Sequence, residues 1–146
     1  MSKLQQWLLA RTPLEGLPVA DDFTWREDGA LPDPGPEQLL CRTIYLSLDP
    51  YQWGRRRRGL EAPGEVCHGR TVAQVMKSNM AGFGDGDFLF NTNGWQSHGL
   101  SGAGIADFTY MFPRKLDPSV APIATAIGVL GMLGLTAYSG LVTCFR

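Results

Sequence analysis

Glycine and proline interrupt this chain so often that short strands joined by turns are the structure it favours. The 146 residues include 18 glycines and 10 prolines. Both residue types mark turns, glycine because it tolerates left-handed backbone and proline because its ring fixes φ. Between them, segments such as residues 23–27 (FTWRE) alternate apolar and polar side chains at the period of a half-buried strand. The pattern argues against a bundle of helices.

The segments that we predict to be strands are 4–11, 23–27, 38–46, 70–76, 88–91, 95–100 and 108–112. Many short strands at near-regular spacing are typical of a barrel or a sandwich. A turn is expected at Asp49 and Pro50, because the residue before a proline is pushed out of the helical region. The arginines at 55–58 are then expected to enter an irregular loop that contains Gly59, Pro63 and Gly64.

The last part of the chain differs from the rest, since residues 118–145 carry no charged side chain. We expect a helix there, from about residue 120 to 142. A helix needs about 20 mainly apolar residues to cross a bilayer, so length alone would permit a membrane segment. Alanine, glycine and threonine are frequent in this stretch, however, and Gly128, Gly131 and Gly134 are typical of a tightly packed internal helix. The prediction is therefore no membrane association.

Size, charge and cysteine content narrow the class of protein. The length suits one domain with a hydrophobic core of its own. The net charge of −1 gives no general attraction to nucleic acid or to an anionic membrane. Cys41, Cys67 and Cys144 are odd in number and lack a CxxC spacing, which suits free thiols in a reducing cytoplasm. The first residues lack the features of a secretory signal peptide.

Two motifs carry a resemblance to a known enzyme family. Residues 45–51 read YLSLDPY, and residues 128–138 read GVLGMLGLTAY. Shorter matches at 9–11, 16–18, 69–75, 86–87, 94–96 and 115–118 follow the order of the same family. Together they resemble the zinc-independent branch of the medium-chain dehydrogenase/reductases, which includes prostaglandin reductases, leukotriene B4 12-hydroxydehydrogenase, alkenal double-bond reductases and bacterial curcumin reductase.

The resemblance implies a mainly β fold, with a GroES-like barrel over residues 1–119 that forms the substrate cleft. A junction helix and the start of a linker would occupy residues 120–146. In the family, NADPH gives a hydride to the β-carbon of an α,β-unsaturated ketone or aldehyde, and the resulting enolate is protonated. A Rossmann domain that holds NADPH follows this helix in the family, whereas the sequence here stops at Arg146.

We therefore expect the N-terminal domain of an NADP-dependent enone reductase that binds no NADPH and catalyses no reduction alone. No G-x-G-x-x-G fingerprint occurs in the sequence. The alternative is a non-catalytic remnant or interaction module, produced by truncation, a frameshift or alternative splicing. Without a partner domain the helix would expose apolar surface, so self-association or pairing with a separate cofactor domain is expected.

Three residues are candidates for the active site of the intact enzyme. Tyr51 resembles the family's cleft tyrosine, and a phenol is a suitable donor to a developing oxyanion. Met132 and Thr136 are four residues apart and so share one helix face. The resemblance places both against the nicotinamide ring. The alternatives are a loop anchor for Tyr51 and core packing for Met132 and Thr136.

A zinc site is not expected, although zinc alcohol dehydrogenases belong to the wider superfamily. His68 falls near the position of a metal-binding histidine in those enzymes. By the same resemblance the other two ligands would be Asp49 and Met132, and a thioether is a poor zinc ligand. We expect His68 and His98 to be partly exposed turn or strand residues instead.

The sequence departs from the family at several positions. Gln52 and Trp53 replace the usual Met-Arg, and residues 67–69 (CHG) replace a more usual Met-Arg-Gly, which would reshape one cleft wall. The four arginines at 55–58 are not usual in the family. We expect them to form a solvated loop, and attraction of a substrate or cofactor anion is the less favoured interpretation.

Overall fold

The computed structural model describes residues 3–27, 29–105 and 112–144. The mainly β fold class is confirmed. The strands are β1 (Gln5–Leu9), β2 (Phe23–Glu27), β3 (Gln38–Leu46), β4 (Thr71–Ser78), β5 (Phe88–Asn91), β6 (His98–Gly102) and β7 (Arg114–Leu116). The α-helices are α1 (Pro50–Arg57) and α2 (Met132–Ser139). Single helical turns are η1 (Ala20–Asp22), η2 (Ile123–Ile127) and η3 (Gly140–Cys144).

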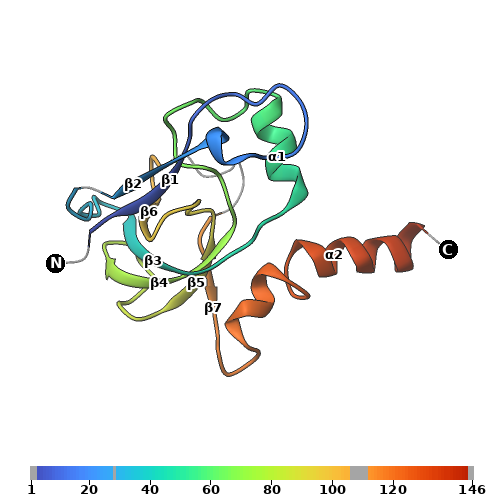
Figure 1. Ribbon diagram of the computed structural model, residues 1–146. Coiled ribbons are helices and arrows are strands. Elements are labelled where there is room, and N and C mark those ends of the chain that lie inside the picture. Colours follow the sequence, from blue (N-terminus) through green and yellow to red (C-terminus); the bar gives the residue numbers. More distant parts are fainter. Residues whose placement is uncertain (1–2, 28, 106–111, 145–146) are drawn as a thin grey trace.

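Five of the strands form one antiparallel sheet in the order β6-β3-β4-β5-β7. β1 and β2 form a separate antiparallel ribbon (Figure 1). Isolated bridges join this ribbon to the rest of the barrel, Gln6 to Gln96 and Leu8 to Val66. The ribbon therefore packs along the segments that precede β6 and β4.

β4 is buried on both faces, and each face contributes to a different hydrophobic cluster. Ala73 and Val75 pack in the barrel interior with residues of β3 and β5. Val72 points to the opposite face, where it packs with Phe90 and with Ala126 of η2. Side chains alternate across a strand, so one strand can serve both clusters. η2 is thereby fixed to the outer face of the sheet.

Helix α1 is a finding that the sequence prediction missed, since we expected a turn and a loop there. Asp49 is extended, with φ −103° and ψ 141°, and Pro50 occupies the start of the helix. Proline suits the first helical turn because the amide hydrogen it lacks would have no helical partner there. Gly59 has φ 66° just beyond the helix, the left-handed conformation that commonly follows a C-terminus. The residues that indicated a turn therefore delimit a helix.

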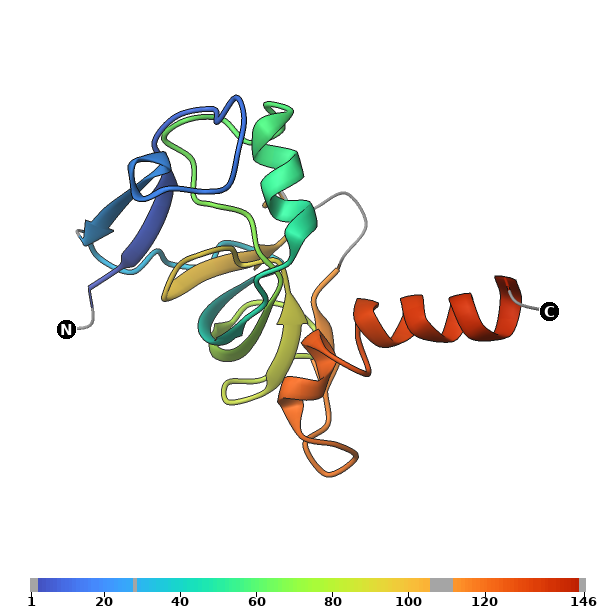
Figure 2. The ribbon, with the colours of Figure 1, turned by 45° about the vertical axis from the view of Figure 1, so that its right-hand side comes forward.

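The C-terminal segment is not the single helix predicted for residues 120–142. It divides into η2 and α2, with a break at residues 128–131. No residue of α2 is buried, and the helix projects away from the barrel in both ribbon views (Figures 1 and 2). Within the described ranges, no helix combines the length and apolarity needed to cross a membrane.

Most strand predictions are confirmed, with shifted ends. The segments 23–27, 38–46 and 88–91 match their strands, while 4–11 and 70–76 correspond to β1 and β4 with ends displaced by one to two residues. The segment 95–100 only overlaps β6, and β7 was not predicted. Residues 106–111 lie outside the described residues, and they include the larger part of the predicted segment 108–112.

Candidate active site

Tyr51 in the first turn of α1 contacts a histidine that lies before β4. The Tyr51 Oη atom is 2.9 Å from Nε2 of His68, and the two rings meet edge to face with centroids 5.9 Å apart. Both side chains are half-buried. The contact links α1 to the segment that enters β4, and it pairs a phenol with an imidazole.

The surroundings of this pair favour uncharged forms at neutral pH. Burial raises the pKa of Tyr51, while the positive charge of Arg70 opposes that rise. Burial, together with the nearby charges of Arg55 and Arg70, lowers the pKa of His68 to about 4. The phenol therefore keeps its proton, and the imidazole is a neutral hydrogen-bonding partner. Such a pair can hold or pass a proton at the Tyr51 hydroxyl.

Arg70 connects this pair to helix α2. Its guanidinium lies 4.9 Å from the centre of the Tyr51 ring, and its Nη1 atom is 2.8 Å from the sulfur of Met132. The Arg70 residue is only 7% exposed. His68 and Arg70 are two residues apart just before β4, so extended backbone places them on the same side.

Gly69, between His68 and Arg70, is required by close packing. A Cβ atom at this position would lie 2.7 Å from Cδ1 of Leu46 and 2.9 Å from Cδ1 of Trp95. No ordinary side chain fits such a gap without displacing its neighbours. The backbone between His68 and Arg70 is thus held against the barrel.

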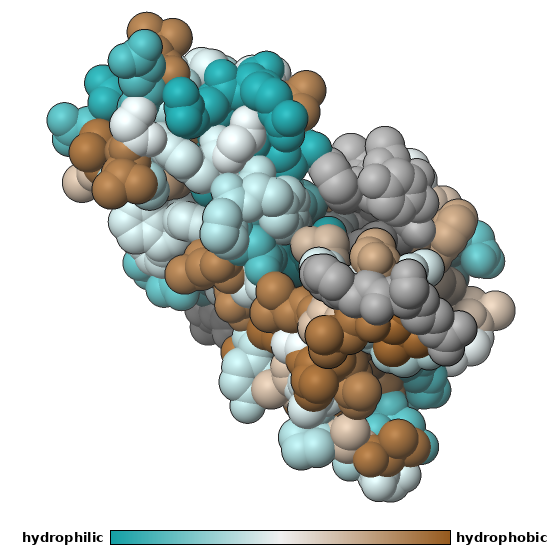
Figure 3. Space-filling view, turned by 90° about the vertical axis from the view of Figure 1, so that its right-hand side faces the viewer, coloured by the Kyte–Doolittle hydropathy of each residue, from teal (hydrophilic) through white to brown (hydrophobic). Residues whose placement is uncertain are grey.

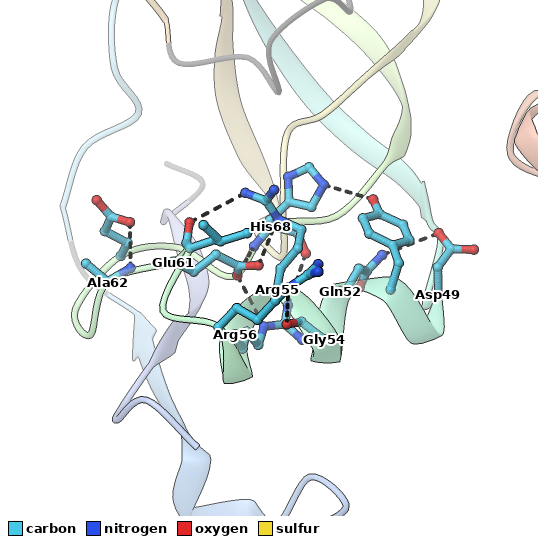
Figure 4. Close-up of polar contacts among 12 residues, drawn as sticks. Asp49, Gln52, Gly54, Arg55, Arg56, Glu61, Ala62 and His68 are labelled. Atoms are coloured by element: carbon cyan, nitrogen blue, oxygen red, sulfur yellow. Dashed lines mark hydrogen bonds and ion pairs between the residues drawn. The ribbon is translucent and has the colours of Figure 1, made fainter. Parts of the chain in front are cut away.

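Arg56 corrects the expectation that residues 55–58 form a solvated loop. Its side chain is 3% exposed and pairs with Glu61 at 3.2 Å. The same Glu61 carboxylate accepts a hydrogen bond from the amide of His68, and Arg56 Nη2 donates to the His68 carbonyl (Figure 4). Arg56 also lies 4.6 Å from the centre of the Trp95 ring. This clamp fixes the backbone of His68, so Arg56 is a positioning residue.

An open cavity of about 610 Å³ lies where the barrel meets α2. Its wall includes Arg70, Phe90, Arg114, Leu130, Met132 and Leu135. The wall is mostly apolar, as in most sites for small organic ligands. Tyr51 is not part of the wall, but its ring lies against Arg70, which is.

The predicted site residues are brought together only in part. Tyr51 and Met132 both contact Arg70, from α1 and from α2. Thr136 lies one turn beyond Met132, is exposed, and does not belong to the cavity wall. The structure therefore assembles Tyr51 and Met132 in one cluster and leaves Thr136 outside the cavity wall.

The two histidines differ in burial. His68 is half-buried, as expected, whereas His98 at the start of β6 is only 8% exposed and lies 3.1 Å from the Ser97 hydroxyl. Burial lowers the pKa of His98. Across the part of the chain that the structure describes, no three histidine, cysteine, aspartate or glutamate side chains are grouped to hold a metal ion.

Sequence reasoning missed the roles of His68, Arg70 and Arg56. The partners Tyr51 and His68 are 17 residues apart, and Arg70 and Met132 are 62 apart, so no local pattern connects them. One signal was available. Arg70 directly precedes the apolar strand β4, and a charged residue beside a buried strand indicates a buried role for its side chain.

A β-barrel with a ligand-sized cavity at the base of a projecting helix defines the class of protein. The class is that of small β-barrel domains, and comparison with known proteins identifies the family. Residues 5–107 match the family described as the N-terminal domain of oxidoreductase. The chain belongs to this family, within the medium-chain dehydrogenase/reductases, and its barrel is GroES-like.

The similar proteins include both curated and solved reductases. The chain is 38% identical over 143 residues to NADPH-dependent curcumin reductase of Escherichia coli, a match that covers 94% of the chain and 39% of that reductase. It is 33% identical to prostaglandin reductase 1 of Rattus norvegicus, with coverages of 97% and 41%. The structure of CurA from Vibrio vulnificus in complex with NADPH gives a TM-score of 0.78 at 35% identity, covering 94% of the chain and 40% of CurA. The chain thus spans about two fifths of the length of these relatives.

Proposed function

We propose that this chain forms the substrate-cleft domain of an NADP-dependent reductase of α,β-unsaturated ketones and aldehydes. The carrying observation is the cluster of Tyr51, His68, Arg70 and Met132 beside an apolar cavity of about 610 Å³. In this proposal residues 1–119 shape the cleft, and residues 120–146 form the junction to a dinucleotide-binding domain. The curated relatives named as NADPH-dependent or prostaglandin reductases support it.

The residues at the cavity fit a nicotinamide ring. Met132 lines the cavity and is 39% exposed, so a flat ring can reach its thioether. Thr136 is exposed one turn further along α2 and is available to the same ring. Bound NADPH would supply the hydride that reaches the β-carbon of the substrate. The proposal needs no zinc, because the hydride would come from NADPH and hydrogen bonds to the carbonyl oxygen can stabilise the enolate.

The protein's part in the reaction is to orient the carbonyl and supply a proton. As charge develops on the carbonyl oxygen, the Tyr51 hydroxyl donates a hydrogen bond to it. His68 orients the hydroxyl through its neutral imidazole, and a proton from solvent replaces the one that the enolate takes from Tyr51. The apolar wall around Leu130 and Leu135 keeps water away from the reacting carbons.

The 146 residues alone are proposed to be inactive, since they contain no dinucleotide fingerprint. The three cysteines are free thiols, which agrees with a place in the reducing cytoplasm. A second candidate is a non-catalytic interaction module, and the exposed apolar side chains of α2 favour it. Both candidates allow the isolated chain to self-associate or to pair with a separate cofactor domain.

A chimera separates the two candidates. The chain would replace the aligned N-terminal part of Escherichia coli curcumin reductase, and the chimera would be incubated with NADPH and an unbranched methyl enone. The expected product is the saturated ketone, identified by mass spectrometry. Formation of the allylic alcohol, or no product from a folded chimera that binds NADPH, would contradict the proposed reductase function.

A further inference from the structure

A buried glutamine lies in the first turn of α1, next to Tyr51. Gln52 is only 2% exposed, a low value for a polar side chain. Its side-chain amide donates a hydrogen bond of 2.7 Å to the carbonyl of Ser47, which directly follows β3. The backbone amide of Ser47 in turn donates to the carbonyl of Arg70 at 2.9 Å. A short chain of hydrogen bonds therefore joins the turn that carries Tyr51 to the segment that carries Arg70.

The start of α1 is held by this glutamine rather than by the usual kind of cap. Asp49 is the N-cap residue, yet its carboxylate caps no amide of the described helix. A capping side chain normally satisfies one of the unpaired amides of the first turn. Instead, Asp49 Oδ2 accepts a hydrogen bond of 2.7 Å from the Ser47 hydroxyl and a longer one, of 3.4 Å, from Nε2 of Gln52 (Figure 4). The Gln52 amide thus ties the helix start at two points.

Gln52 also acts on the acidity of the Tyr51 hydroxyl. The charged or titratable groups that act on this hydroxyl are Asp49, Arg55, His68 and Arg70. Burial raises the pKa of Tyr51, and hydrogen bonding to Gln52 opposes that rise. A donor beside the phenol oxygen favours the ionised form, so it makes the hydroxyl a readier proton donor. The position and the acidity of Tyr51 hence both depend on one neighbouring side chain.

We propose that Gln52 is a positioning residue for Tyr51, which fixes the first turn of α1 against the end of β3 so that the Tyr51 hydroxyl meets the reacting carbonyl oxygen. The inference rests on the proposed function and deepens it, since it adds a residue that acts through Tyr51. Gln52 does not belong to the cavity wall, so its effect does not come from contact with a ligand bound there. Methionine, the usual residue of the family at this position, has a similar length but donates no hydrogen bond.

Gln52→Met in the chimera with curcumin reductase tests the proposal, because it keeps the side-chain length and removes the hydrogen bonds. We expect kcat for an enone to fall about 3-fold to 10-fold, the scale of a lost hydrogen bond, with KM almost unchanged. The alkaline limb of the kcat profile should move to higher pH, because the pKa of Tyr51 rises without Gln52. An unchanged kcat or an unmoved limb would overturn the role of Gln52 and leave the reductase function intact.

The matched control is Gln74→Met, which removes another hydrogen-bonded glutamine of the barrel. The partners of Gln74 are the Arg42 side chain and the Gly86 carbonyl rather than residues of the site, so we expect the same kcat and the same pH profile.

The 146-residue chain provides a second measurement that needs no catalysis. Ultraviolet absorbance follows the ionisation of its tyrosines, and comparison with Tyr51→Phe isolates the contribution of Tyr51. Gln52→Met should move that contribution to higher pH, while circular dichroism shows that the fold is kept. An unmoved contribution in the folded chain would overturn the inference. If the folded chimera binds NADPH but reduces no enone, the proposed function fails, and this titration still decides whether Gln52 acts on Tyr51.

Discussion

The barrel and the C-terminal segment of this chain differ in what holds them together. In the barrel, Leu39, Val72 and Leu89 are completely buried, and buried ion pairs such as Arg56 with Glu61 are fixed by further hydrogen bonds. In α2, Leu133 and Leu135 are 58% and 64% exposed, and no residue is buried. The space-filling view shows apolar surface gathered on the side from which α2 projects (Figure 3). The barrel is stabilised by its buried core, whereas α2 buries none of its side chains.

The two regions meet at the candidate site. Arg70 of the barrel contacts Met132 of α2, and the cavity opens between them. The cavity has the buried barrel on one side and the exposed helix α2 on the other, which suits the proposal that a second domain completes the site. The comparison therefore predicts that substitutions in the barrel change stability, while substitutions in α2 change association.

The largest expected effect comes from the buried clamp of the barrel. Arg56→Met removes the shorter ion pair of the buried Glu61 carboxylate, leaving the 3.5 Å pair with Arg55, and it removes the hydrogen bond to the His68 carbonyl. We expect the free energy of unfolding to fall by about 3–5 kcal/mol. Urea denaturation measures it, with Arg57→Met as the control because Arg57 is exposed on the same helix. Equal stabilities of the two variants would mean that the clamp does not support the barrel.

The next effect concerns catalysis in the chimera with curcumin reductase. Tyr51→Phe removes the hydroxyl that meets His68 but keeps the ring that packs against Arg70. We expect kcat for an enone to fall about 100-fold, the usual scale for loss of a general acid, with a small change in KM. Steady-state kinetics measures both constants. An unchanged kcat would make Tyr51 a structural residue only.

A smaller effect is the pH dependence contributed by His68. Because burial lowers its pKa to about 4, the unfolded chain binds a proton more readily than the folded one between pH 6.5 and 4. Stability from this group is complete above pH 6.5 and is lost as the pH falls through 4. We expect His68→Gln to lessen that loss by about 1–2 kcal/mol after allowance for partial exposure. Parallel stability curves for the two proteins would contradict the assignment.

The smallest effect on stability is expected in α2 and η3. Replacing Leu133 and Leu141 by glutamate should change the free energy of unfolding by less than about 0.5 kcal/mol, because both side chains are exposed. The contrast is Leu39→Ala in the barrel, with an expected cost of about 2–5 kcal/mol. Light scattering should show that the unsubstituted chain self-associates and the double variant does not. A monomeric unsubstituted chain at high concentration would remove this distinction.

The sequence predicted the barrel better than it predicted the helices. Alternation of apolar and polar residues located β2, because a half-buried strand repeats every two residues, whereas β3 and β5 were located as short apolar runs between turn residues. Helix α1 was missed because Asp49 and Pro50 suit both a turn and a helix start. The division between η2 and α2 was missed because an uncharged, apolar stretch does not show where a helix breaks.

The candidate site was predictable only in part. The motif at residues 45–51 pointed to Tyr51, and the motif at 128–138 pointed to Met132. Tyr51 and Met132 are connected through Arg70, which contacts both side chains. These contacts form only when the chain folds, because Arg70 is distant from Met132 in the sequence. Arg56 was taken for a solvated residue because a run of charges is usually exposed, and only the fold brings Glu61 beside it.

The central claim is that the barrel supplies the substrate cleft and that NADPH, held by a second domain, would supply the hydride. Steady-state oxidation of NADPH tests it most directly, with equal concentrations of the 146-residue chain and of the chimera, and with one enone as the substrate. The account predicts turnover by the chimera and background rates for the chain alone. Turnover by the chain alone, or none by a folded chimera that binds NADPH, would contradict it.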